Sequence, residues 1–260
     1  MIPRYLKPNK EYDLIRLGQD NDGGYLVERG SISKSKALIT LGLGYDWSFE
    51  KNFSEKFKKP IYCYDHTVNY SGIKKLCRKF IASYFFRIFK PKHVFKKNFF
   101  TNLYKSIFLY RDYKNFFSNK AQHIEKRIGS GDGGIMLNEI FNTKKDICPL
   151  FLKIDIEGSE YRIFDEIIEN QENLTGIAIE LHYVDLHLDK IKNFIENLDM
   201  DLVHIHPQNT AFVTKDFIPT QLELTFAKHP KIISEDVKIP HHLDQPANPS
   251  FPEIQLKFEK

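Results

Sequence analysis

Two pairs of titratable side chains stand where apolar runs of the sequence end. Asp155 and Glu157 end one run, with a single residue between them, and Glu180 and His182 end another. Residues two apart on a strand point to the same face. Ligands of open α/β sheets bind outside the carboxyl ends of the strands. We therefore expect two neighbouring strands to deliver three acids and one imidazole into a single crevice.

Such a crevice could remove a proton from a hydroxyl group. Imidazole has the side-chain pKa nearest to neutral pH, so we favour His182 as the general base, with Asp155 and Glu157 orienting a substrate. Two carboxylates and one imidazole also suit Mg²⁺ or Mn²⁺, and a divalent cation held by these three residues is a second interpretation. Structural roles are a third: Glu157 as an acid stabilised at a helix N-terminus, and His182 as a hydrogen-bonded residue ending a strand.

A glycine pair follows an earlier apolar run. Residues 37–41 read as a strand that leads into Gly42 and Gly44, and a helical pattern then continues to about residue 58. Glycines let the backbone approach a ligand closely, and the N-terminus of the next helix favours polar or anionic groups. The dinucleotide-binding motif has a third glycine where this chain has Trp47. An NAD-dependent oxidoreductase is therefore disfavoured.

A second strand, at residues 60–64, ends in Asp65 and His66. Asp65 follows the glycine pair by about 20 residues, the spacing at which a carboxylate meets ribose hydroxyls in doubly wound folds. A solvated aspartate at the end of a strand is the simpler alternative. The glycine-rich stretch 129–134, after a third predicted strand at 123–128, is either one wall of an adenine pocket or a flexible connection.

The remaining patterns complete an α/β chain of 260 residues, a length that fits one large domain. The last strand alternates apolar and polar residues strictly, as an antiparallel strand does. We predict a doubly wound, seven-stranded mixed sheet in one domain, with a helical insertion at about 67–120 and a surface tail at about 229–260. The other expected elements are a turn at 21–24, strands at 25–27, 151–154, 177–182, 201–206 and 221–227, and helices at 136–141, 161–169 and 186–198.

The insertion is basic and aromatic. No Asp or Glu occurs between His66 and Arg111, and lysines and arginines alternate with phenylalanines on either side of Pro91. This pattern is typical of amphipathic helices. It predicts a cap with a solvated basic face, a surface for a phosphate-bearing substrate, or a peripheral contact with an anionic membrane. Basic and aromatic residues also bind single-stranded nucleic acid, but the net charge of +4 is mild and no known RNA-binding pattern accompanies it, so no nucleic-acid partner is predicted.

Cysteine usage and hydropathy indicate the compartment. Three cysteines without a Cys-x-x-Cys pair favour a reducing environment. The N-terminus has no apolar segment of the signal-peptide kind, and no apolar run approaches the ~20 residues of a membrane span. We therefore expect a cytoplasmic protein without a transmembrane segment. The oligomeric state is not indicated.

One stretch resembles a known family. Phe151–Glu160 reads FLKIDIEGSE, which closely resembles the LKIDIEG-E signature of FkbM-type methyltransferases. The order of predicted strands and helices is similar to the sheet of class I S-adenosylmethionine-dependent methyltransferases, whose seventh strand is antiparallel. Residues 179–182 resemble the fifth strand of that family, and segments 22–25 and 42–46 resemble its bacterial members. The resemblance spans residues 12–227, apart from the insertion.

The resemblance implies a cofactor and an activity. S-adenosylmethionine would lie across Gly42 and Gly44, with its ribose on Asp65 and His66 and its sulfonium near Asp155. FkbM-type enzymes methylate hydroxyl groups of polyketides and surface glycans. The implied function is thus O-methylation of a sugar, either nucleotide-activated or in a capsule or lipopolysaccharide. A polyketide or other small-molecule acceptor, or a non-catalytic binding module, are the alternatives.

The chain departs from the wider family at one position. Many class I enzymes have an acid two residues before the first glycine, where this chain has Thr40. The contact to the methionine amine is therefore expected from Asp46, Ser48 or backbone carbonyls.

Overall fold

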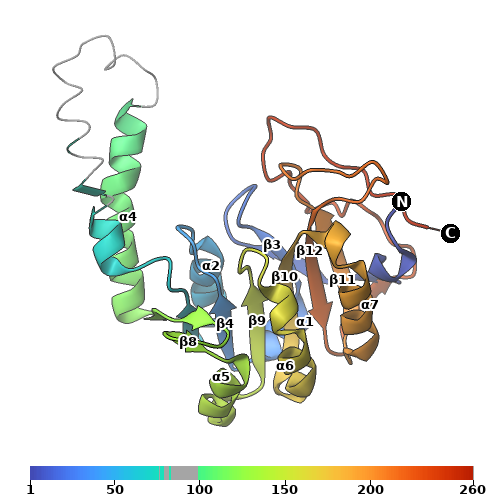
Figure 1. Cartoon of the computed structure of the whole chain (residues 1–260), viewed down its shortest axis with the longest axis horizontal. Helices are drawn as coiled ribbons and strands as arrows, with labels where there is room; N and C mark the ends of the chain where they lie inside the picture. The colour runs from blue at the N-terminus through green and yellow to red at the C-terminus, as the bar shows by residue number, and fades with distance from the viewer. Residues whose placement is uncertain (76, 79–81, 83–98, 260) are drawn as a thin grey trace.

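The structure is a computed structural model that describes residues 1–75, 77–78, 82 and 99–259. Its centre is a seven-stranded sheet (Figure 1). β12 runs antiparallel to both of its neighbours, while the five strands from β10 to β6 are parallel. The predicted doubly wound mixed sheet is therefore confirmed. The strand order is β11 (Asp201–Pro207), β12 (Gln221–Ala227), β10 (Leu174–His182), β9 (Leu150–Ile154), β4 (Ala37–Leu41), β5 (Ile61–Tyr64) and β6 (Gln122–Ile124).

Helices cover both faces of this sheet. One face packs against three helices through a single apolar cluster; these are α5 (Leu137–Thr143), α6 (Phe164–Glu169) and α7 (Leu188–Asn197). The second face packs against α1 (Arg29–Lys34), α2 (Ser48–Phe57), α4 (Phe99–Asn119) and the hairpin of β2 (Leu14–Leu17) and β3 (Tyr25–Glu28). Short 3₁₀ turns occupy Arg4–Leu6, Lys145–Ile147, Glu160–Arg162, Gln171–Asn173 and Val184–Leu186.

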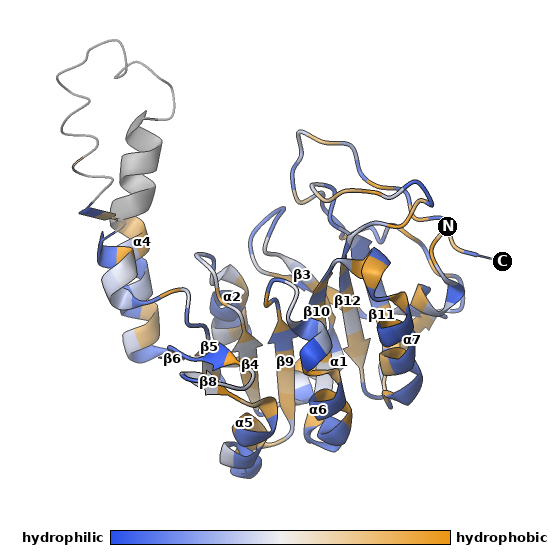
Figure 2. Ribbon diagram, in the orientation of Figure 1, coloured by the Kyte–Doolittle hydropathy of each residue, from blue (hydrophilic) through white to orange (hydrophobic). Residues whose placement is uncertain are grey.

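The central strands are apolar because both of their faces are covered. Figure 2 shows apolar residues gathered on the sheet, with polar residues on the outer sides of the helices. Every residue of β4 and β9 is buried, including the two polar ones, Thr40 and Lys153. Thr40 donates its hydroxyl to the buried Glu50, and Lys153 lines a cavity.

One predicted strand divides into two. Residues 123–128 were expected to form a single strand, but β6 ends at Ile124, and β7 (Arg127–Ile128) pairs instead with β8 (Gly134–Ile135) in a separate two-stranded parallel sheet. The backbone turns between them, where Lys126 N–H donates to the Ile124 carbonyl at 2.8 Å.

The C-terminal segment crosses the edge of the domain. β13 (Ile232–Ser234) pairs with β1 (Glu11–Tyr12) near the N-terminus. Further along, the carboxylate of Asp244 lies 2.8 Å from His204 Nε2 on β11. The sequence did not indicate β13, because a strand of three residues is too short for its alternation of apolar and polar residues to be recognised.

The insertion attaches to the domain through a tryptophan. Trp47 is 2% exposed, and its Nε1 donates to Asp112 of α4 at 2.8 Å. Its ring also packs edge-on against Tyr113 and Phe117. The residue that stands where a dinucleotide-binding fold has glycine therefore anchors α4, which extends away from the sheet (Figure 1).

Most of the basic and aromatic residues expected to form the cap fall within 79–98, outside the described residues, so their role stays a prediction. Among the helices that the structure describes, none is long and apolar enough to cross a lipid bilayer.

Candidate active site

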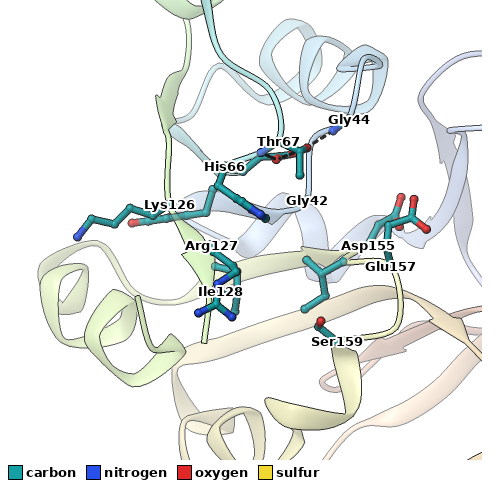
Figure 3. Close-up of a pocket in the computed structure, with 13 residues that line it drawn as sticks. Gly42, Gly44, His66, Thr67, Lys126, Arg127, Ile128, Asp155, Glu157 and Ser159 are labelled. Carbon is teal, nitrogen blue, oxygen red and sulfur yellow. Dashed lines mark hydrogen bonds between the residues drawn. The ribbon is translucent and has the colours of Figure 1, made fainter. Parts of the chain in front are cut away.

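A cleft of about 220 Å³ lies at the carboxyl ends of β4, β5 and β9 (Figure 3). The carboxylates of Asp155 and Glu157 lie together on one wall, and His66 and Arg127 lie on the opposite one. Its lining comprises Gly42, Gly44, Tyr64, Asp65, His66, Thr67, Lys126, Arg127, Ile128, Asp155, Ile156, Glu157 and Ser159. The glycine-rich stretch 129–134 does not line the cleft, and the apolar Ile128 just before it does.

The two glycines after β4 have different roles. Gly42 has φ +82°, and a Cβ there would lie 1.6 Å from the carbonyl oxygen of Asp155. Gly44 has φ +57°, and a Cβ there would meet nothing within 4 Å. Gly42 therefore lets the loop press against the end of β9, while Gly44 leaves open space beside the backbone, as a closely approaching ligand requires.

Asp65 holds this loop in place. One carboxylate oxygen accepts the N–H groups of Leu43 at 2.8 Å and Gly44 at 3.0 Å. The other accepts both the N–H and the hydroxyl of Thr67 at 2.6 Å. Burial raises the pKa of Asp65, but the hydrogen bonds from Thr67, Gly44 and Leu43 outweigh it, so the pKa lies below its ordinary value. Because a carboxylate has about four acceptor sites, a ribose hydroxyl would have to share or replace one of these bonds.

Asp46 and Ser48 join the cleft to the hairpin. Asp46 accepts from Ser48 N–H at 2.9 Å and from its hydroxyl at 3.0 Å. Ser48 Oγ in turn accepts from Gln19 N–H at 2.8 Å. Asp46 lines a smaller adjacent cavity, whereas Ser48 does not. Asp46 is thus the better placed of the two candidates for a ligand amine.

The structure brings the two pairs of titratable residues together. Glu157 and Glu180 lie 3.5 Å and 3.8 Å from His182 Nε2. The hydroxyl of Tyr25 donates to Glu180 at 2.8 Å, with Asp155 at 3.4 Å. β9 ends at Ile154, so the two acids lie in a turn instead of on the strand.

That turn is formed by backbone of positive φ. Glu157 has φ +54° and Gly158 has φ +93°. The sequence therefore predicted correctly that Asp155 and Glu157 lie close together. The expectation that both side chains project from a strand was wrong, because they lie in a turn.

Glu160 organises the turn, and the sequence reasoning missed it. It is fully buried, and its Oε1 accepts the N–H groups of Ile156 and Gly158, each at 3.1 Å. The same oxygen lies 3.1 Å from His182 Nδ1. Glu160 therefore fixes both the turn and the imidazole. Its place in the family signature was the available signal, but an acid at the start of a helix more often only complements the helix dipole.

The carboxylates change the proton affinity of the imidazole. Burial lowers the pKa of His182, but the hydrogen bond and charge of Glu160, reinforced by Glu180 and Asp155, outweigh burial and raise the pKa to about 9. At neutral pH the imidazole is therefore mostly protonated, which the sequence could not indicate.

Glu180 also binds its proton tightly. Burial, followed by repulsion from Asp155 and Glu223, raises the pKa of Glu180 to about 8. The side-chain amide of Gln221 donates to Glu180 and lies 3.0 Å from His182 Nε2. Glu180 and His182 therefore both hold protons near neutral pH. Asp155 and Glu157 line the cleft, whereas Glu180 and His182 lie behind them and are not part of its lining.

The same cluster has the geometry of a cation site. Asp155, Glu157 and His182 each offer a ligand atom, and these atoms lie within 4.8 Å of one another. Hard oxygen ligands with one imidazole fit Mg²⁺ or Mn²⁺. The metal interpretation therefore stays a prediction beside the general-base one.

Two other histidines lie away from the cleft. His204 and His206 share one face of β11 with their rings 6.4 Å apart, as the alternation of the strand predicts. His206 lies 3.6 Å from Glu223 and 3.5 Å from Glu253, and the C-terminal segment covers both rings.

No protein-family model matches this chain, and no curated protein matches it. Several solved methyltransferase structures are similar to it in fold. The METTL16 methyltransferase domain is 10% identical with a TM-score of 0.40; the match covers 75% of this chain and 60% of that domain, less than two thirds of its length.

Two further structures give the same level of similarity. A candidate tRNA (m1A22) methyltransferase from Streptococcus pneumoniae, in complex with S-adenosyl-L-methionine, is 10% identical with a TM-score of 0.38, over 79% of this chain and 72% of that one. A candidate sarcosine dimethylglycine methyltransferase from Galdieria sulphuraria is 10% identical with a TM-score of 0.39, over 76% and 80%. Similarity at this level assigns no substrate to the chain.

Proposed function

We propose that this protein transfers a methyl group from S-adenosylmethionine to a hydroxyl group of a sugar. The observation that carries the proposal is the convergence of Asp155, Glu157 and the Glu160–His182 pair beside a cleft with an open glycine. A hydroxyl nucleophile needs a proton acceptor, and a positioned base contributes roughly 10²–10⁴-fold to such a reaction. The signature at residues 151–160 supports the same assignment.

The residues around the cleft fit the cofactor. Gly44 leaves room for close approach, Asp65 and His66 offer polar groups for ribose, and Tyr64 and Ile128 offer apolar surface for a base. When bound, S-adenosylmethionine supplies an electrophilic methyl group, and the protein supplies alignment and proton removal.

His182 is the proposed proton acceptor. Glu160 holds its Nδ1, which leaves Nε2 on the side of Glu157 and Glu180. Because the pKa of His182 is raised to about 9, the neutral imidazole is scarce at neutral pH and increases as the pH rises. We therefore expect turnover to increase between pH 7 and pH 9.

The acceptor is proposed to carry phosphate. Arg127 lines the wall opposite the acids, and the basic insertion begins at the end of β5. Cationic side chains of this kind bind phosphate oxygens. Nucleotide-activated sugars are therefore the first acceptors to test.

The test is a methyl-transfer assay with labelled S-adenosylmethionine and a panel of nucleotide sugars. Titration calorimetry with S-adenosylhomocysteine is run in parallel. Transfer to a sugar hydroxyl that is lost in His182→Gln, with binding retained, supports the proposal. If the wild type does not bind S-adenosylhomocysteine, the cofactor assignment is wrong.

Two further arms refine the assay. Methylation of a non-sugar acceptor in place of sugars overturns the substrate class and leaves the cofactor assignment standing. Loss of activity with EDTA that Mg²⁺ restores shows that the divalent-cation interpretation is the correct one.

A further inference from the structure

Lys153 is a buried cation in the middle of the sheet. Only 5% of the residue is exposed. Its Nζ lies 5.0 Å from the centre of the Tyr25 ring and 5.9 Å from that of Phe49. Within the described part of the chain, its Nζ has no hydrogen bond and no carboxylate oxygen within 4.0 Å. Lys153 also lines a cavity, so its ammonium group can be reached from there.

Lys153 lies among the carboxyl groups of Glu50, Asp155 and Glu180, which interact with its ammonium group. A negatively charged group that enters the cavity lined by Lys153 could therefore accept a charge-assisted hydrogen bond from it.

Lys153 faces a second cavity of about 140 Å³. This cavity shares Gly44 and Asp155 with the first cleft, so the two cavities meet at these residues. Asp22 and Asp46 also line the second cavity. An elongated ligand with its nucleoside in the first cleft would reach the second with its other end.

We propose that Lys153 binds the α-carboxylate of the methyl donor in this second cavity. The inference rests on the proposed function, since it assigns the amino-acid half of the same cofactor. Asp22 and Asp46 are placed to receive the α-ammonium, because each oxygen of Asp46 accepts only one hydrogen bond within the described chain, from Ser48.

The proposal also accounts for Thr40. Where many class I enzymes have an acid, Thr40 donates its hydroxyl to the buried Glu50 at 2.8 Å. Glu50, on α2, is therefore the acid beside Thr40, and its carboxyl group interacts with Lys153. The ammonium group of Lys153 then lies in the cavity where the methionine part of S-adenosylmethionine is expected.

The experiment compares two ligands that differ only in the carboxylate. S-adenosylhomocysteine carries it, and S-adenosyl-3-thiopropylamine lacks it but keeps the ammonium. Calorimetry is run on the full-length wild type, on Lys153→Met, and on a double variant, Lys153→Met with Glu50→Gln, which removes both buried charges together. Lys192→Met, on the exposed side of α7, is the matched control.

We expect the wild type to prefer S-adenosylhomocysteine by about 10- to 100-fold, as a charge-assisted hydrogen bond provides. In both Lys153 variants this preference should vanish, while affinity for the decarboxylated ligand changes by less than about threefold. Thermal unfolding shows whether each variant is folded. The double variant keeps the test valid if the single one unfolds.

Three results would overturn the inference. In the first, the preference for the carboxylate survives in a folded Lys153 variant. In the second, the Lys153 variants lose affinity for both ligands equally, which would mean that Lys153 supports the pocket without binding the carboxylate. In the third, the wild type binds neither ligand; the proposed function itself is then wrong, and this outcome is distinct from the other two.

Discussion

The pairing of Glu160 with His182 makes a quantitative prediction about proton affinity. Replacing Glu160 with Gln removes a charge and little else, because Oε1, which accepts from Ile156, Gly158 and His182, is retained in the amide. The second carboxylate oxygen is buried and, among the described residues, has no hydrogen-bond partner. The turn should therefore persist while the electrostatic effect is lost.

The size of the effect follows from the geometry. An opposite charge in direct contact raises the pKa of a histidine by about 1–3. The pKa of His182, about 9 in the wild type, should therefore fall to between roughly 6 and 8 in Glu160→Gln. At pH 7 about one wild-type molecule in a hundred has a neutral imidazole, and the variant should have many more.

The assay is NMR of histidine-labelled protein, with ring signals followed from pH 5 to pH 10. The chain has ten histidines, and the signal missing from His182→Gln identifies the one of interest. Glu166→Gln is the matched control, because Glu166 is a buried acid on α6 that accepts from Asn138 N–H at 2.7 Å and has no bond to His182. A wild-type His182 that titrates near 6.5, or a Glu160→Gln variant that leaves its pKa unchanged, would refute the reasoning.

The same pair sets a pH dependence of stability. The pKa of His182 is higher in the folded than in the unfolded chain, so its contribution is fully present below about pH 6.5. That contribution is lost as the pH rises through about 9. Glu160→Gln should therefore lower the melting temperature more at pH 6 than at pH 10, as thermal unfolding at the two pH values would show. An equal loss at both would mean that the charge pair does not stabilise the fold.

Other substitutions test the remaining parts of the site. Asp155→Asn and His182→Ala should each lower turnover by about 10²–10⁴-fold with S-adenosylhomocysteine affinity within a few-fold by calorimetry; unchanged turnover would make both residues structural. Gly44→Val should abolish that binding in a folded protein, whereas Gly42→Ala should fail to fold, since its Cβ would lie 1.6 Å from a carbonyl oxygen; binding by Gly44→Val would show that the cleft lies elsewhere. Asp65→Asn should weaken binding about tenfold by loosening its loop, and full affinity in that variant would exclude this role. EDTA should leave turnover unchanged, and a loss reversed by Mg²⁺ would show the opposite.

The fold and the meeting place of the acids could be predicted because both follow from local pattern. Apolar runs ending in polar residues mark buried parallel strands, and their carboxyl ends share one edge of the sheet. Asp155, Glu157 and His182 were identified on that basis alone. The antiparallel strand β12 was recognised from its strict alternation.

The rest of the site depends on contacts that no local pattern encodes. Glu160 acts through a turn of positive φ that gathers two N–H groups onto one oxygen. Asp65 looks like a free strand-end acid in the sequence, but the N–H groups of Leu43 and Gly44 turn it inward. Lys153 reads as one polar residue in an apolar strand, and only the tertiary structure shows that it lines a cavity.

The contacts between Trp47 and α4 determine where the insertion can change in length. Trp47 lies three residues beyond Gly44 and contacts Asp112, Tyr113 and Phe117, so one side chain joins the glycine loop to α4. A change in the length of the sequence before α4 would leave these three contact residues in place. Displacement of α4 would break these contacts, three residues away from Gly44.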